Sequence, residues 1–379
     1  LPAIQVAFTV FVIVETWLVP FEGYLVDRFG PRVVSVVSGV MVAAAWVINS
    51  RANSIPLLYL GAAVGGIGAG GVYGACVGNA LKWFPDRRGL ASGITAMGYG
   101  AGSAFTVYPI ANMIKAQGYE AAFFKFGIAQ GLVIMIVGWW LKAAPINAVA
   151  SVALRAKRIV EATPMQMLRS PAFWVMYVMF VLTATGGLIA TAQVKPIATD
   201  FGLAGDAMAT LGTITVVALP FALAMSRVLN GFSRFFFGWV SDHLGRERTM
   251  AAAFALEAVS FLLLNRYGAT PTAFVLTTSL IFFAYGEIYS LFPAACGDWY
   301  GKKYASANAG LLYTAKGTAS LIVPLSSVLA ANFGGWSSVF LALAVMNVVA
   351  SLLAILVLRP LRPDAIVTGV GGPALEVSA

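Results

Sequence analysis

Three cationic side chains lie within stretches that are otherwise apolar: Arg227, Arg234 and Lys316. Arg227, Asn230 and Arg234 are spaced i, i+3 and i+7, so a helix would place them on one face. An arginine offers a planar fork that matches a carboxylate, and a lysine adds a compact point charge. Together they suit an anion with one or two carboxylate groups. Ionisable groups are costly in apolar surroundings, which makes these residues candidates for function.

Tyrosines accompany the cations at helical spacing. Tyr313 lies three residues before Lys316, while Tyr285 and Tyr289 are four residues apart on another apolar stretch. Each of these pairs would share a helix face. Their hydroxyls would donate hydrogen bonds to an anion, and their rings would wall its pocket.

Acidic residues also occur within apolar stretches, at Glu15 and Glu287. A carboxylate beside the two cations would lower the net positive charge of the site and favour a monoanion over a dianion, or it would carry protons. The alternative is that these acids only neutralise the buried cations; for Glu287, Arg227 is a candidate structural partner. We interpret Glu257 as structural.

The composition indicates which elements hold these residues. Hydrophobic residues make up 60% of the 379 and charged residues only 10%, far from the quarter typical of soluble chains. Windows of about 20 apolar residues, long enough to cross a bilayer as helix, divide the chain into eleven predicted spans. They lie near 3–22, 32–49, 56–80, 90–114, 121–143, 170–194, 208–240, 249–266, 272–296, 305–332 and 336–358. Helices are expected throughout, because backbone groups in lipid must be satisfied within the segment.

The net charge of +9 does not indicate a nucleic-acid partner. Lysines and arginines concentrate in alternate connections between the spans, which the positive-inside rule assigns to the cytoplasm. The chain has two cysteines, and His243 is its single histidine. We therefore expect no disulfide, no metal site and no cofactor. The sequence shows no nucleophile–base pair, so an enzyme is disfavoured.

A ten-residue motif near the start of the chain is repeated in the second half. The segment GYLVDRFGPR at 23–32 recurs as GWVSDHLGR at 238–246, offset by 215 residues (238 − 23). A second pair, at 83–93 and 299–310, has nearly the same offset. The motif residues are Gly23, Asp27, Arg28, Gly30 and Arg32 in the first copy and Gly238, Asp242, Gly245 and Arg246 in the second. The chain is therefore predicted to consist of two parallel repeats.

This duplicated Gly-x-x-x-Asp-Arg-x-Gly motif resembles the signature loop of the major facilitator superfamily. The resemblance implies an all-α membrane protein of two helical bundles, with the motif in the gate and the substrate bound near the midplane between the halves. We expect bundles at 1–143 and 170–359, a cytoplasmic linker at 144–169 and a cytoplasmic tail at 360–379. The first span would run inward to a basic loop, so we also expect one further helix, the first of twelve, to precede this chain.

A closer resemblance, to the oxalate/formate antiporter family, is carried by segments 230–242, 289–293, 313–320 and 83–93. In that family the residues matching Arg234 and Lys316 bind the substrate carboxylates, and matching aromatic residues line the pocket. Tyr285 and Tyr313 depart from the family pattern, in which tryptophan is expected. The resemblance implies a site made of Arg234, Lys316, Tyr73, Tyr99, Tyr285, Tyr289 and Tyr313. We add Asn230, which would share a helix face with Arg234.

These observations predict a secondary active transporter that exchanges small carboxylates of the oxalate and formate type by alternating access. A proton-coupled monocarboxylate symporter is one alternative, with Glu287 and Glu15 as candidate proton carriers. A non-transporting membrane sensor is another. We expect a monomer in the lipid bilayer of the cell inner membrane, with a cytoplasmic C-terminus and a small carboxylate as its partner.

Overall fold

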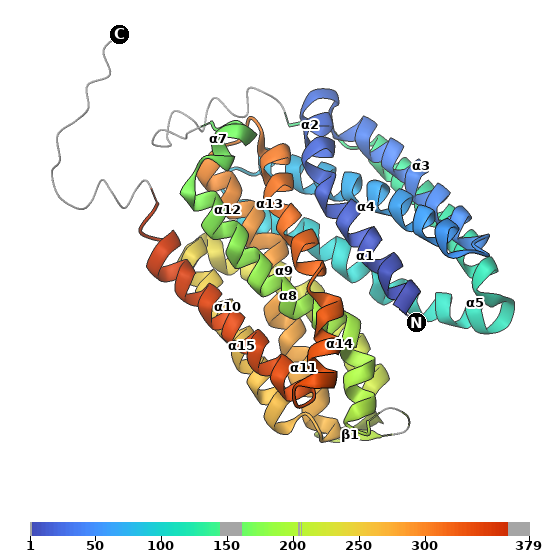
Figure 1. The fold of residues 1–379 in the computed structure, drawn as a ribbon. Coiled ribbons are helices and arrows are strands. Elements are labelled where there is room, and N and C mark those ends of the chain that lie inside the picture. Colours follow the sequence, from blue (N-terminus) through green and yellow to red (C-terminus); the bar gives the residue numbers. More distant parts are fainter. Residues whose placement is uncertain (1, 145–160, 204, 206, 363–379) are drawn as a thin grey trace, which may run out of the picture.

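The computed structural model describes residues 2–144, 161–203, 205 and 207–362. The first half of the chain consists of five helices that pack side by side (Figure 1). Their bounds are α1 Pro2–Trp17, α2 Val19–Phe29, α3 Pro31–Ser50, α4 Ile55–Trp83 and α5 Arg88–Trp139. The predicted spans 90–114 and 121–143 both fall on α5, which changes direction at Gly118, where φ is +83°. Only glycine adopts such a φ at little cost.

The second half forms the other helical group. Its bounds are α7 Pro164–Leu168, α8 Pro171–Asp200, β1 Met208–Leu211, β2 Ile214–Val217, α9 Ala218–Leu244, α10 Arg246–Tyr267, α11 Pro271–Tyr285, α12 Ile288–Tyr300, α13 Ala305–Ser320, α14 Val323–Asn332, α15 Trp336–Leu353 and a final π-helical turn, Ala354–Leu358. The halves lie against each other near α2 and α13, while β1 lies at the far end of the second half (Figure 1).

The prediction that a helix begins near residue 208 is wrong. Residues 208–217 instead form an antiparallel hairpin, with Met208 opposite Val217. Gly212 supplies the positive φ of +63° that the tight turn needs, and the flanking strands contain β-branched Thr215, Val216 and Val217. Apolar content alone does not distinguish such a hairpin from a helix end.

The remaining predicted spans coincide with helices or with pairs of consecutive helices. The span at 3–22 is broken at Leu18, where α1 and α2 meet with a bend of 40°. The span at 272–296 breaks at Gly286–Glu287, between α11 and α12. By length and hydropathy alone, seven helices of the described chain are able to cross a membrane, or eight if the bent pair counts as one span. Among the described helices, α9, which carries Arg227, Arg234 and Asp242, and α10 are not among these seven.

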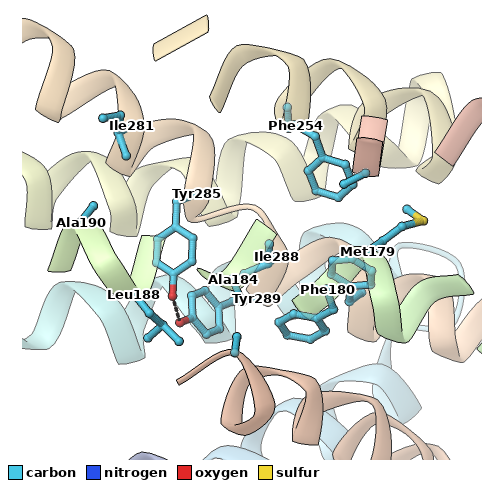
Figure 2. Packing of buried hydrophobic residues seen from close by; sticks show 14 of the residues in the cluster. Met179, Phe180, Ala184, Leu188, Ala190, Phe254, Ile281, Tyr285, Ile288 and Tyr289 are labelled. Carbon is cyan, nitrogen blue, oxygen red and sulfur yellow. Dashed lines mark hydrogen bonds between the residues drawn. The ribbon is translucent and has the colours of Figure 1, made fainter. Parts of the chain in front are cut away.

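Aromatic side chains make the core of the second half. Phe180 of α8 stacks on Phe292 of α12 with ring centroids 4.5 Å apart, and Phe254 of α10 lies beyond it (Figure 2). Large apolar side chains elsewhere point outward; Val133 and Trp140, for example, are 59% and 73% exposed. An apolar surface of this kind is typical of a protein surrounded by lipid.

The two copies of the repeat adopt the same local structure. Gly30 lies between α2 and α3 with φ +86°, and Gly245 lies between α9 and α10 with φ +91°. In both halves, a glycine with positive φ therefore separates two consecutive helices at the equivalent position of the repeat. This agreement supports the parallel repeat that the sequence predicts.

The described part of the predicted linker packs on the second half. Thr163 caps α7 through a reciprocal capping box with Gln166. The Glu161 carboxylate accepts hydrogen bonds from the backbone N–H groups of Lys302 and Lys303, at 2.9 and 2.7 Å. The rest of the linker, 145–160, and most of the predicted tail, 363–379, lie outside the described residues.

Candidate functional site

Arg234 is a buried cation on α9, and no carboxylate pairs with it among the described residues. Its Nη1 donates to the Ala96 carbonyl of α5 at 2.9 Å, and its Nη2 donates to Asn230 Oδ1 at 2.8 Å. The Nε–H has no partner. Its guanidinium lies over the ring of Tyr289, 4.0 Å from the centroid. Arg234 therefore contacts both halves and keeps one donor and its positive charge available.

Lys316 is equally buried, but it has an acidic partner from the other half. Its Nζ donates to both carboxylate oxygens of Glu15 on α1, at 3.1 and 2.8 Å, and to the Tyr313 hydroxyl at 2.9 Å. The Tyr313 hydroxyl itself donates to Glu15 at 3.2 Å. Glu15 therefore lies beside Lys316. Of the two buried cations that the sequence analysis considered for neutralisation by an acid, only Lys316 forms such an ion pair within the described residues.

Tyrosine rings connect the two cations. Lys316 Nζ lies 5.6 Å from the centroid of the Tyr289 ring, the same ring that Arg234 covers. The hydroxyl groups of Tyr285 and Tyr289 form a hydrogen bond of 2.6 Å (Figure 2). The Tyr285 ring fits against Gly187 of α8, where any side chain would collide with it. Arg234 and Lys316 thus both lie near the Tyr289 ring, whose electron-rich face attracts cations.

The first half contributes two more tyrosines from α4 and α5. Tyr73 stacks on Tyr313 with centroids 4.4 Å apart and meets Tyr99 edge to face at 5.6 Å. Tyr99 lies at the margin of the cluster with 41% of its surface exposed, and its hydroxyl donates to the Ala69 carbonyl. The Tyr73 hydroxyl is buried and has no partner. The structure thus brings together all eight residues predicted to bind substrate. Four of them contact the ring of Tyr289 or Tyr313: Arg234, Lys316, Tyr73 and Tyr285. Asn230 contacts Arg234, and Tyr99 contacts Tyr73.

Glu287 is the predicted acidic residue that lies apart from this cluster. It is fully buried, and neither of its carboxyl oxygens has a hydrogen-bond partner. Within the described residues no ion pair joins it to Arg227, so the structural pairing suggested by the sequence is wrong. Arg227 is half-buried, two turns of α9 before Arg234. Glu287 and Arg227 belong to different helices, so the spacing of residues in the sequence does not predict the distance between them.

The two repeated motifs meet the opposite halves at one end of the molecule. The Asp27 carboxylate accepts from the Ala307 N–H at 3.3 Å, at the start of α13. The Asp242 carboxylate accepts from the N–H groups of Gly89 and Leu90, at 3.1 and 2.8 Å, at the start of α5. Each motif aspartate therefore caps a helix N-terminus of the other half, where a negative charge is favoured.

An ion-pair network that the sequence analysis missed reinforces this end. Asp298 of α12 pairs with Arg88 of α5 and with Arg246 of α10, each at 2.9 Å. Arg246 also pairs with Asp242 at 2.7 Å, and Asp27 with Lys82. Lys82 and Asp298 directly precede Trp83 and Trp299, which begin the repeated segments 83–93 and 299–310. Their equivalent positions in the repeat could have indicated both residues. We call this the charged end, defined by Asp27, Lys82, Arg88, Asp242, Arg246 and Asp298.

Two predicted motif residues are not part of the network. Arg28 is exposed and lies over the ring of Phe29, 5.4 Å from its centroid. Arg32 is also exposed and lies at the same distance from the ring of Trp139 on α5. Their long side chains cover exposed aromatic surface and keep their charges outside.

Comparisons with known proteins agree with this arrangement. The family model of the Major Facilitator Superfamily matches residues 1–230 and 194–375. The oxalate:formate antiporter of Oxalobacter formigenes is 35% identical over 373 residues, 96% of this chain and 85% of that protein. The uncharacterized MFS-type transporter YhjX of Escherichia coli is 25% identical over 302 residues, 79% of this chain and 72% of that protein. Monocarboxylate transporter 9 of Gallus gallus is 41% identical over 84 residues, 22% of this chain and 17% of that protein.

Two solved structures share the fold. The human organic anion transporter MFSD10 aligns with a TM-score of 0.67 over 92% of this chain and 83% of its own, at 14% identity. The proton:xylose symporter XylE, bound to 6-bromo-6-deoxy-D-glucose, aligns with a TM-score of 0.64 over 93% and 86%, at 16% identity. At such low identity these likenesses establish the architecture alone.

Proposed function

This chain belongs to the major facilitator superfamily, and we propose that it is a secondary carrier of small carboxylate anions that works by alternating access. The relatives are transporters of this superfamily, so the chain is a multi-span membrane transporter. The anion would bind among Arg234, Lys316 and the surrounding tyrosines. We place the protein in the cell inner membrane with its charged end and C-terminus in the cytoplasm, where the positive-inside rule puts basic connections.

The observation that carries this proposal is the uncompensated charge of Arg234. A buried cation without a counter-ion is strongly unfavourable unless an anion or substrate completes it. The Arg234 Nε–H and the Tyr73 hydroxyl are both buried and lack acceptors, so two donors are free for an incoming carboxylate. A carboxylate accepts several such bonds at once, and charge-assisted bonds are the stronger ones.

The substrate class follows from the charge of the site. Arg234 and Lys316 contribute two positive charges and Glu15 one negative charge, which leaves one positive charge for the substrate. This balance suits a monocarboxylate such as formate, whereas a dianion such as oxalate requires Glu15 to be displaced or protonated. Exchange of oxalate-type and formate-type anions is our first candidate, by likeness to the oxalate:formate antiporter. Proton-coupled monocarboxylate symport is the second, favoured by the Glu15–Lys316 pair.

The test is uptake of labelled oxalate, formate and lactate into liposomes that contain the purified protein. We expect Arg234→Gln and Lys316→Gln each to reduce carboxylate uptake by at least tenfold, because each removes a charge-assisted contact of roughly 1.5–3 kcal/mol. Arg266→Gln and Lys195→Gln are matched controls, since both residues are exposed. We expect the controls to transport normally.

Two results would contradict the proposal. One is near-normal carboxylate uptake by either site variant at a matched amount of folded protein. The other is a wild-type protein that binds none of the tested carboxylates and moves none of them. Melting temperature in detergent identifies any variant whose loss of uptake only reflects misfolding.

A further inference from the structure

A second group of buried polar side chains lies in the C-terminal half and is not used by the carboxylate site. It consists of Glu257 on α10, Glu287 at the break between α11 and α12, and Asn347 on α15. All three are fully buried, with 0% exposure. Both oxygens of each carboxyl group, and the Asn347 Oδ1, have no hydrogen-bond partner in the described structure.

The group converges on a glycine of α8. Gly186 has no side chain, and a Cβ placed there would lie 2.5 Å from Glu257 Oε1 and 3.3 Å from Asn347 Nδ2. Glu257 and Asn347 therefore occupy the space that this glycine leaves open. Glu287 lies at the start of α12, which packs against both α8 and α10. Two carboxyl groups and an amide are thus buried among α8, α10, α12 and α15.

No positive charge compensates these acids within the described residues. From α9 the nearest cations are Arg227 and Arg234, and neither forms an ion pair with them. From α13 the cation is Lys316, which Glu15 already holds. Elsewhere around the group, α11 contributes the ionisable hydroxyl of Tyr285, α15 the neutral Asn347, and α8 only Gly186 at the contact.

The hydrogen-bond count shows what is missing. Two ionised carboxylates and an amide oxygen are acceptors only, and burying such charges unpaired is prohibitive. A proton on a carboxyl group cancels its charge and converts it into a donor. One proton on each glutamate would therefore remove its buried charge and give each carboxyl group a donor of its own.

We propose that the buried carboxyl groups of Glu257 and Glu287 bind protons inside the C-terminal half, and that their protonation is coupled to transport through Tyr285. The coupling rests on the second candidate function, proton-coupled monocarboxylate symport; the proton binding itself does not. The Tyr285 ring packs at Gly187 of α8, directly after the Gly186 that Glu257 approaches, and its hydroxyl forms a hydrogen bond with that of Tyr289 (Figure 2). The Tyr289 ring lies directly under the Arg234 guanidinium. A change of charge at Glu257 therefore reaches the carboxylate site through two tyrosines.

Infrared difference spectroscopy of the full chain tests the proton site without any transport. Protonated carboxylic acids have a carbonyl band that carboxylates lack. We expect wild-type protein to show this band at neutral pH, and Glu257→Gln and Glu287→Gln each to lose part of it. The exposed acid variant Glu120→Gln should leave the band unchanged. A wild-type protein without the band, or a band unaffected by both site variants, would overturn the proposal.

Transport measurements then test the coupling. In liposomes with an internal pH dye, carboxylate entry through the wild type should acidify the interior, and Glu257→Gln should reduce this acidification at least tenfold. Counterflow exchange should remain within about twofold of wild type, because glutamine keeps the shape of a protonated carboxyl. Undiminished acidification by Glu257→Gln, or uptake driven by sodium in place of protons, would refute the coupling. If the wild type moved no carboxylate at all, the proposed function would be refuted instead. The infrared measurement would still test proton binding by the two glutamates.

Discussion

Glu15 is the residue whose chemistry most affects which anion the site accepts. Its carboxylate occupies Lys316 with two hydrogen bonds and also accepts from Tyr313, as a substrate carboxylate would. A substrate must therefore compete with an internal carboxylate for the same ammonium group. The proposed site would therefore present to a substrate the net charge left after this pairing, not the sum of its two cations.

We expect Glu15→Gln to shift selectivity from formate toward oxalate. The neutral amide leaves Lys316 free and raises the charge of the site by one, which favours a dianion. The expected change in the oxalate-to-formate affinity ratio is about tenfold, or roughly 1.4 kcal/mol. Competition of unlabelled oxalate and formate for uptake of one labelled anion measures it. An unchanged ratio, with Glu120→Gln as the exposed control, would show that Glu15 does not set the charge of the site.

At the scale of the elements, the charged end depends on Asp298, which connects α12 to α5 and α10. The side chains of its partners Arg88 and Arg246 are only 5% and 8% exposed. Removing one member of a buried ion pair leaves a charge unpaired, at a cost of about 3 kcal/mol. Because this network joins the two halves, that cost weakens the closed arrangement of this end more than it weakens either half.

Asp298→Asn should accordingly open the charged end more often. Ser306 reports on this, because it is buried at the start of α13 against Gly23 and Gly78. In a Ser306→Cys background, we expect Asp298→Asn to raise the rate of labelling by a small thiol reagent at least fivefold. Asp86→Asn, which changes an exposed aspartate in the same region, should not change that rate. Equal labelling in the two variants would mean that the network does not hold the halves together.

Over the whole molecule, the two halves meet through glycines at equivalent positions of the repeat. Gly23 lies against the backbone of Ser306 and Ala307, and Gly238 lies against the backbone of Gly89. Backbone atoms cannot move aside as a flexible side chain does, so these contacts require glycine. In the proposed alternating-access cycle, rocking of one half against the other would bring these surfaces together repeatedly.

Gly238→Ala should therefore impair transport without unfolding either half. A methyl group there would overlap the Gly89 backbone and prevent full closure of the charged end. We expect uptake to fall at least tenfold while the affinity for carboxylate, measured by thermal stabilisation, changes little. Gly98→Ala is the matched control on α5, where a Cβ meets no atom within 4 Å. Normal uptake by Gly238→Ala would indicate that the halves do not close through this contact.

Sequence patterns account for most of the architecture because lipid restricts it so strongly. Apolar spans of membrane length must be helical, and a repeat at fixed spacing implies equivalent halves. The spans, the repeat and the residues of the carboxylate site follow from that reasoning and from the family resemblance. The breaks at Leu18 and Gly286 and the hairpin at 208–217 do not, because apolar content alone does not distinguish a broken helix or a hairpin from a continuous helix.

Partnerships between side chains far apart in the chain required the tertiary structure. Glu15 pairs with Lys316 across the two halves, 301 residues apart, whereas Glu257 and Glu287 have no counter-ion in the part of the chain that the structure describes. Both kinds of acid look alike in the sequence, as single carboxylates in apolar helices. Whether a buried acid finds a cation depends on which helix faces pack together, and helical periodicity gives the direction of a side chain only relative to its own helix.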